Sequence, residues 1–404
     1  GTSYYFSVAS GDITNFFNEV DLNTPWDYHY ENLDSRTILD RLAAVKYFVV
    51  KAGEEEYLPY GYDTLAAEAE KKDRLYRAYE CKNALPIGYT YDSYIPEKKY
   101  AKMSTVEKQQ ALLQGVVLAD SAVPETTPEF NDREVPYKLV TGSGCKEKDG
   151  KLIITKENAQ AKLVFDGLDE CETYLITEGV DYEALSPREL ISDKKWNKMT
   201  LYEQKKVQYE NSKWRYWKES QKAYIDVTGQ FLDKTISIFT DKYNAYSGRS
   251  DFLCNTGYSE KGKKSITLTF ENTGVYSYKD MKVVCQPMKN IESQTSRLGT
   301  ESLKDVKIKN HELTGSISVS KDKVLVISLP YSKGFQAYVD GQKTELKQAN
   351  TMYMALELTK GDHEIRITYY TPYLKTGLVL TCVGILCYIC VVLVCKKRRG
   401  NKET

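Results

Sequence analysis

Along residues 1–120 the apolar positions switch between the spacing of helices and that of strands. Ser104 and Glu107 form a capping box, which predicts a helix that begins there and runs to about residue 118. The other predicted elements are short helices and strands at 15–19, 35–44, 45–50, 74–80 and 87–91, with the last two paired. Residues 1–120 are therefore predicted to form a mixed α/β region.

The pattern changes after residue 120. Pro124, Pro128 and Pro136 stand among acidic and polar residues, which predicts a linker over 121–140. Beyond it come short strands in which apolar and polar positions alternate, as over 265–270. Short strands at regular spacing indicate a β-sandwich, so residues 141–372 are predicted to form one. The fold class is therefore α+β, with the β-sandwich following the mixed region.

Two turns and one insertion complete this prediction. Asp340-Gly341 suits the left-handed positions of a hairpin turn, and a second hairpin is predicted at Lys360-Gly361. A charged, aromatic stretch at about 193–224 interrupts the strands and contains Trp196, Trp214 and Trp217 at only weakly helical spacing. Because indoles favour the edge of a bilayer, we expect this insertion to contact either lipid or a ligand.

The chain then carries nineteen uncharged residues, Gly377–Cys395, closed by four basic ones: Lys396, Lys397, Arg398 and Arg399. As a helix the run measures about 28 Å, close to the hydrocarbon thickness of a bilayer. The alternative, a buried helix of a soluble protein, does not need basic residues at its end. Residues 373–395 are therefore predicted to form one transmembrane helix, with 396–404 as a basic tail.

The flanking charges also predict orientation. Excess Lys and Arg mark the cytoplasmic side, so residues 1–372 are expected outside the cell membrane and the tail inside. The opposite orientation, that of a tail-anchored protein, stays open. The four basic residues are the predicted membrane-anchor site, since they attract anionic headgroups. Residues 1–20 contain no basic segment followed by an apolar one, as a signal peptide has, so we expect a C-terminal piece of a longer membrane protein.

Composition restricts the classes of partner that the chain is expected to bind. The chain has 56 basic and 56 acidic residues, and this zero net charge favours no nucleic-acid partner. The 33 tyrosines suit either half-exposed sheet faces or a carbohydrate-facing surface. Four of the nine cysteines lie in the apolar run and the other five are widely spaced, so no disulfide framework is predicted. Asn-x-Ser/Thr sites are absent, which favours a bacterial surface protein.

The sequence contains no strong catalytic constellation. Its three histidines, His29, His311 and His363, do not have the spacing of a zinc hydrolase, and no nucleophile elbow, phosphate loop or dinucleotide fingerprint is present. The aromatic cluster around His29 could hold a metal or a sugar, or could simply pack a loop. Hydrolysis by paired carboxylates stays open for Asp251 and nearby acids. No catalytic residue, metal site or cofactor is predicted.

Several segments resemble the YfhO family of bacterial membrane proteins. Ser328–Gly341 resembles the family's C-terminal signature, and it is continued by similar segments at 349–350, 358–363 and 369–372. Further upstream, segments at 39–47, 79–89 and 254–258 match in the family's order. Phe335 stands where the family has Trp, and Tyr373 where Pro-Gly is commoner. The resemblance implies a GT-C-like glycosyltransferase that transfers a sugar from a polyprenyl-phosphate carrier to a teichoic-type polymer. Its catalytic acids are expected in N-terminal helices and loops outside this sequence.

Two functions follow as hypotheses. In the first, the chain is an extracytoplasmic domain that positions a cell-wall or lipoteichoic-type acceptor for a membrane glycosyltransferase. Its partners are the lipid bilayer and, through the N-terminal part, the polyprenyl-phosphate sugar and the anionic wall polymer. In the second, it is a non-enzymatic single-span surface module that binds wall polymer or a partner protein. A transport permease is disfavoured because the apolar run has no charged group at its middle.

Overall fold

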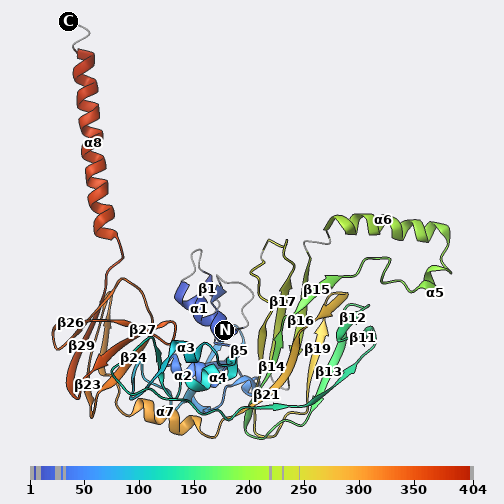
Figure 1. The fold of residues 1–404 in the computed structure, drawn as a ribbon, viewed down its shortest axis with the longest axis horizontal. Coiled ribbons are helices and arrows are strands. Elements are labelled where there is room, and N and C mark those ends of the chain that lie inside the picture. Colours follow the sequence, from blue (N-terminus) through green and yellow to red (C-terminus); the bar gives the residue numbers. More distant parts are fainter. Residues whose placement is uncertain are drawn as a thin grey trace.

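The computed structural model describes residues 4–5, 11–22, 29–30, 33–217, 221–229, 232–244 and 246–400. Over these residues the protein consists of two β units, a layer of helices between them, and a long C-terminal helix that projects from the body (Figure 1). The predicted α+β class is confirmed. The predicted single β-sandwich differs from the structure, which has two β units with separate cores.

The central β unit contains three antiparallel sheets. The five-stranded sheet has the order β10 (Tyr137–Thr141), β13 (Ala159–Phe165), β19 (Ser265–Phe270), β16 (Lys222–Thr228), β17 (Asp233–Phe239). The second sheet has the order β18 (Phe252–Ser259), β14 (Cys171–Glu178), β21 (Asp280–Pro287), β9 (Arg133–Val135). The third has the order β11 (Cys145–Lys148), β12 (Lys151–Ile154), β20 (Gly274–Ser277), β15 (Asp181–Ala184). Their inner faces share one core, with Leu268 of the first sheet and Leu175 of the second both buried in it.

The C-terminal β unit has two sheets. The outer sheet has the order β22 (Lys304–Lys309), β23 (Glu312–Val319), β29 (Gly361–Tyr369), β25 (Phe335–Val339), β26 (Gln342–Thr344). The inner sheet has the order β27 (Lys347–Ala349), β28 (Tyr353–Leu358), β24 (Lys323–Pro330), β6 (Gly88–Tyr91). Leu325 and Leu356 of the inner sheet pack against Ile317 and Ile367 of the outer one.

The inner sheet is buried on both faces. Leu325 and Leu356 point to the outer sheet, whereas Val324, Val326 and Tyr353 pack against the helical layer. This layer contains α1 (Gly11–Glu19), α2 (Thr37–Leu42), α3 (Glu97–Tyr100), α4 (Thr105–Ala111) and α7 (Ile291–Gly299). A sheet covered on both sides needs continuous apolar strands, which explains the run of buried residues over 324–327.

Smaller elements complete the body. A three-stranded sheet has the order β3 (Tyr47–Lys51), β5 (Arg74–Cys81), β4 (Tyr62–Lys71), and the turn η1 (Glu55–Tyr57) joins β3 to β4. Two short pairs are β7 (Tyr94–Pro96) with β8 (Val116–Leu118), which are parallel, and β1 (Tyr4–Tyr5) with β2 (His29–Tyr30). The insertion carries α5 (Asp193–Trp196) and α6 (Leu201–Trp217), and α8 (Leu374–Gly400) ends the described chain.

A buried polar network joins α2 to the central β unit. The Glu172 carboxylate accepts hydrogen bonds from the Thr37 backbone N–H at 3.0 Å and from the Tyr174 hydroxyl at 2.5 Å. Asn255 Nδ2 donates to the carbonyl oxygens of Asp34 and Ser35. Buried polar groups of this kind must be paired, so they fix one orientation of α2 on the sheet. Residues 254–258, one of the segments that resemble the YfhO family, therefore have a structural role.

The structure differs from the predicted boundaries. Residues 1–120 do not form a separate region, because β6 completes the inner sheet of the C-terminal unit. The predicted linker 121–140 carries β9 and most of β10, which pair with β21 and β13. The capping box at Ser104 is confirmed, but α4 ends at Ala111 and β8 follows it. Proline and acidic residues therefore gave a wrong linker prediction where short strands are anchored by their sheet partners.

One predicted turn is confirmed and two predicted strand pairs are wrong. Asp340-Gly341 joins the hairpin of β25 and β26. By contrast β28 and β29, on either side of Lys360-Gly361, belong to different sheets. Likewise β5 pairs with β3 and β4, while β6 pairs with β24. Alternating apolar and polar residues identify the strands. Which strands pair depends on which face of each sheet is covered by other elements.

The Asp340-Gly341 turn is held by His363. Its Nδ1 lies 2.8 Å from Asp340 Oδ2 and its Nε2 lies 2.8 Å from the Thr359 carbonyl oxygen. Both oxygens accept hydrogen bonds, so this geometry favours the protonated imidazole, in which both ring nitrogens donate. Burial lowers the pKa of His363, but the bonds to Thr359 and Asp340 outweigh it and the net shift is upward.

We therefore expect stability to fall as pH rises. A His with a raised folded pKa stabilises the protein fully below about pH 6.5, and this contribution is lost as pH rises through the folded pKa. Between pH 5.5 and 8 the wild type should lose a few tenths to about 1 kcal/mol more than His363→Gln, which does not titrate. Thermal unfolding of the wild type and of His363→Gln at several pH values across this range measures the difference in stability. Equal pH slopes would show that the predicted protonation is wrong.

The helix α8 has the properties of a membrane span. Leu374–Cys395 is long and apolar enough to cross a bilayer, and none of it is buried in the protein. An unburied helix of this composition is stable in lipid rather than water, so the predicted transmembrane helix is confirmed over the buried-core alternative. The predicted anchor residues 396–399 lie in the last turns of α8.

Candidate functional site

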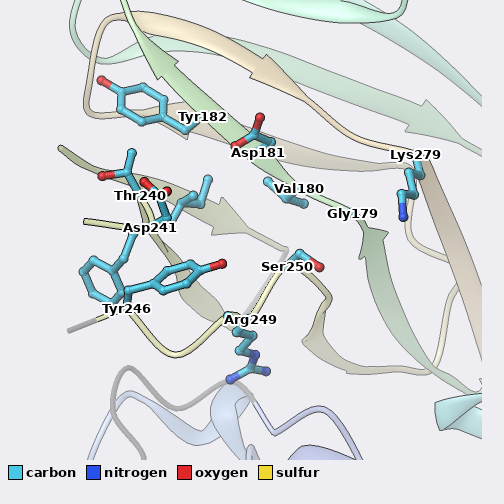
Figure 2. A pocket seen from close by; sticks show the side chains of 13 residues that line it. Gly179, Val180, Asp181, Tyr182, Thr240, Asp241, Tyr246, Arg249, Ser250 and Lys279 are labelled. Atoms are coloured by element: carbon cyan, nitrogen blue, oxygen red, sulfur yellow. The ribbon is translucent and has the colours of Figure 1, made fainter. Parts of the chain in front are cut away.

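A cavity of about 450 Å³ opens on the central β unit beside β15 and the end of β17 (Figure 2). Three segments line it, at 179–182, 238–241 and 246–250, together with Lys279. We call this cavity the groove. It gathers exposed carboxylates, an exposed tyrosine and two cations within one opening, so it is the candidate binding site of the chain.

The two strands at the groove supply a fixed wall. On β15, Tyr182 is buried and packs against Tyr276, with the two rings tilted by 51° and their centroids 5.0 Å apart. Its hydroxyl donates a hydrogen bond to the Thr273 carbonyl at 2.9 Å. Strand residues alternate between faces, so its neighbour Asp181 is exposed. At the end of β17, Phe239 stacks on Tyr243 with ring centroids also 5.0 Å apart. The wall is therefore positioned by packing before any ligand arrives.

The exposed groups stand on this wall. Tyr246 is 50 % exposed and its ring lies in the middle of the opening (Figure 2). The carboxylates of Asp181 and Asp241 lie on the far side of the opening from Arg249. An ionised carboxylate only accepts hydrogen bonds and an exposed tyrosine ring offers a flat apolar face, so together they suit ligands with many hydroxyl groups.

The other side of the groove is held by Asp251. Its Oδ1 accepts from the Gly179 backbone N–H at 2.7 Å and from the Ser250 hydroxyl at 3.0 Å. Arg249 donates from Nε to the Asp251 carbonyl oxygen and lies over the Phe252 ring. The sequence leaves paired-carboxylate hydrolysis open for Asp251 and nearby acids. In the structure the Asp251 carboxylate holds the loop through the bonds from Gly179 and Ser250.

A second cavity of about 250 Å³ adjoins the groove and shares Arg249 and Ser250 with it. Its other wall is Asn18 of α1 and Asp21 just after α1. Burial raises the pKa of Asp21, although a bond from Thr105 and the charge of Arg249 oppose this. Burial also lowers the pKa of Arg249. The two adjoining cavities together extend the candidate site from the central β unit onto the helical layer.

The remaining candidates from the sequence do not form a site. Among the residues that the structure describes, no group of three His, Cys, Asp or Glu side chains is arranged to hold a metal ion. His363 holds a turn, and His311 lies beside Tyr370 with ring centroids 6.3 Å apart. The cluster around His29 falls largely outside the described residues, so its metal or sugar role stays a prediction.

All nine cysteines are free. The five in the body are buried, and burial raises the pKa of the Cys145 thiol to about 11 and that of Cys171 and Cys254 to about 12. The reactive form of cysteine is the thiolate, so these side chains serve as apolar packing.

The membrane helix and the body recur together in known proteins. A sequence model of the family described as bacterial membrane protein YfhO matches residues 1–381. The chain belongs to the YfhO family. A curated YfhO relative, an uncharacterized protein of Bacillus subtilis (strain 168), is 22 % identical over 417 residues. The match covers 99 % of this chain and 41 % of that protein, so this YfhO chain spans about two-fifths of its relative's length.

Solved structures offer weaker comparisons. Arabinofuranosyltransferase AftD from mycobacteria, as a mutant R1389S, is 14 % identical over 42 % of this chain and 14 % of its own, with a TM-score of 0.16. A second AftD structure is 12 % identical over 38 % of this chain and 12 % of its own, at the same TM-score. Similarity at this level carries no argument about the YfhO chain.

Proposed function

We propose that this chain is the extracytoplasmic domain and last transmembrane helix of a membrane glycosyltransferase-like protein. Residues 1–372 lie outside the cell and the basic tail inside, in keeping with the excess of Lys and Arg after α8. The domain positions a cell-wall or lipoteichoic-type acceptor while a polyprenyl-phosphate carrier supplies the sugar. The groove, with an exposed tyrosine in its opening and exposed carboxylates on its wall, is the observation that supports this proposal most strongly.

The chemistry of the groove fits such an acceptor. Teichoic-type polymers alternate hydroxyl-bearing units with phosphodiesters. The hydroxyl groups donate to Asp181 and Asp241, and the Tyr246 ring packs against the carbon skeleton. Lys279 and Arg249 border the same opening and attract the phosphodiesters (Figure 2). Because Arg249 lies across the opening from the two carboxylates, the hydroxyl groups and phosphodiesters of the polymer are held in one register (Figure 2).

The transfer step itself is assigned to other parts of the full-length protein. The Ser250 hydroxyl at the groove donates to the neighbouring Asp251 carboxylate, but the same carboxylate oxygen accepts from the Gly179 backbone N–H. This contact therefore holds the loop, and we assign it no part in the transfer. The catalytic acids, the donor site and the choice of sugar therefore belong to the rest of the protein in this proposal. The domain contributes proximity, because it binds the acceptor and so raises the acceptor's effective concentration near the reaction.

A second candidate is a non-enzymatic surface module that binds wall polymer or a partner protein. The same groove supports it, since binding needs no catalytic group. The two candidates agree on polymer binding and differ on sugar transfer.

Polymer binding gives a direct prediction for the groove. Tyr246→Ala should weaken binding of purified lipoteichoic acid by about tenfold, because a stacked aromatic face contributes on the order of 1 kcal/mol or more. Binding is measured by titration of the chain in lipid nanodiscs. Tyr47→Ala is the matched control, since Tyr47 on β3 is also 50 % exposed and lies outside the groove. Equal affinities of the two variants would remove the groove from the proposal.

A further inference from the structure

We infer that α6 lies on the surface of the bilayer into which α8 inserts, and that its outward face binds anionic lipid headgroups. The sequence left open whether this insertion meets lipid or another ligand. The inference rests on the geometry of α6 and on α8, and does not require the proposed glycan function.

The placement of α6 comes first. It projects from the central β unit, while α8 leaves from the C-terminal β unit at the opposite end of the body (Figure 1). Despite this separation, α6 lies at the height at which α8 begins and runs across the direction of α8 (Figure 1). A bilayer spanned by α8 therefore has its near surface at the level of α6. The helices α6 and α8, which leave opposite ends of the body, are therefore placed to contact the same bilayer.

The inner face of α6 is attached to the rest of the insertion. Gln204, Val207, Asn211 and Trp214 follow helical spacing and are half-buried. Gln204 Nε2 donates to the Trp196 carbonyl at 3.0 Å, and Asn211 Oδ1 accepts from the Arg188 backbone N–H at 3.2 Å. The Arg188 guanidinium lies 4.4 Å from the centre of the Trp196 ring. These contacts fix which side of the helix faces outward.

The outward face combines tyrosine and lysine. Tyr202 and Tyr209 stand one heptad apart and are 79 % and 60 % exposed. Lys205, Lys206 and Lys213 are exposed beside them. Tyrosine rings and lysine stems suit the headgroup region, where one end of a side chain is apolar and the other is wet.

The acidic residues of α6 are already engaged. Glu203 accepts from the Thr200 backbone N–H at 2.7 Å and from its hydroxyl at 2.8 Å, which caps the helix. Glu210 lies 3.6 Å from Lys213. Three exposed lysines, Lys205, Lys206 and Lys213, stand against these two acids, so the balance of charge on the outward face is positive. This face lacks the wide apolar stripe of a deeply inserted helix. Such a helix lies among the headgroups and depends on anionic lipid.

Photo-cross-linking tests the position of α6. The chain carrying p-benzoylphenylalanine at Tyr209 is placed in nanodiscs of phosphatidylglycerol and irradiated. Ser296 is the control position, because it is exposed on α7, on the side of the body away from α8 (Figure 1). We expect lipid adducts at position 209 at least about tenfold above those at 296, as only an interfacial residue reaches lipid. Equal lipid yields, or adducts only with added lipoteichoic acid, would overturn the inference.

A charge variant tests the headgroup chemistry. Replacing Lys205, Lys206 and Lys213 with Gln should lower the adduct yield at position 209 in phosphatidylglycerol by roughly a hundredfold, at about fivefold for each of the three charges removed. In phosphatidylcholine the yield should hardly change. Lys304, Lys307 and Lys309 of β22 are also exposed, and their Gln variant should leave the yield unchanged. Circular dichroism confirms that α6 stays folded. A yield independent of these lysines would contradict headgroup binding.

Discussion

Arg41→Met should destabilise the protein by about 3 kcal/mol, because it removes one partner of a largely buried ion pair. The Arg41 side chain is 0 % exposed and donates to Glu292 Oε1 at 2.5 Å and Thr295 Oγ1 at 3.1 Å. The pair joins α2 to α7, which are far apart in sequence. Gly61 allows this approach: its φ is +82°, and a side chain there would collide with the Arg41 guanidinium.

Chemical denaturation of the chain in nanodiscs measures this loss. Glu292 keeps contact with water, so the expected cost lies at the lower end of the range for buried pairs. Lys46→Met is the control, since Lys46 pairs with Glu80 at the surface and should change stability by less than about 1 kcal/mol. Similar losses in both variants would show that the Arg41 pair does not hold the helical layer together.

Leu356→Ala should cost about 2–5 kcal/mol, the usual range for a leucine removed from a packed core. Leu356 is fully buried on β28, between the two sheets of the C-terminal β unit. Val326 lies on the opposite face of the same sheet, against the helices. Because one sheet serves both cores, Leu356→Ala and Val326→Ala should shift the same unfolding transition.

Exposed positions provide the reference for this experiment. Ile308 on β22 is 65 % exposed, and Ile308→Ala should change the free energy of unfolding by less than about 0.5 kcal/mol. Two separate transitions, only one of them shifted by each core variant, would show that the helical layer and the C-terminal β unit unfold independently.

The sequence predicted the elements with strong local signals. The uncharged run predicted α8, the capping box predicted the start of α4, and Asp340-Gly341 predicted the hairpin of β25 and β26. It could not predict that β6 joins β24, more than two hundred residues away, since that pairing depends on which faces are covered. The linker prediction failed for the same reason.

The groove was less predictable. Its residues come from β15, from the end of β17 and from the loop before β18, and none of these segments carries a motif. The only local signal is the cluster of tyrosine, glycine and charged residues over 241–251, which also reads as an ordinary loop. A site assembled from side chains on several strands becomes visible only once the strands are paired.

Sugar transfer by the full-length protein tests the central claim most directly. The protein is reconstituted in nanodiscs with a polyprenyl-phosphate sugar and lipoteichoic acid, and labelled polymer is measured for wild type, Tyr246→Ala and Tyr47→Ala. Our account predicts transfer by all three, with the acceptor KM raised about tenfold in Tyr246→Ala alone and kcat unchanged, since a binding contact outside the reaction affects KM. Polymer binding without any transfer would contradict the glycosyltransferase proposal and favour the surface module. Transfer with an unchanged acceptor KM in Tyr246→Ala would contradict the role of the groove.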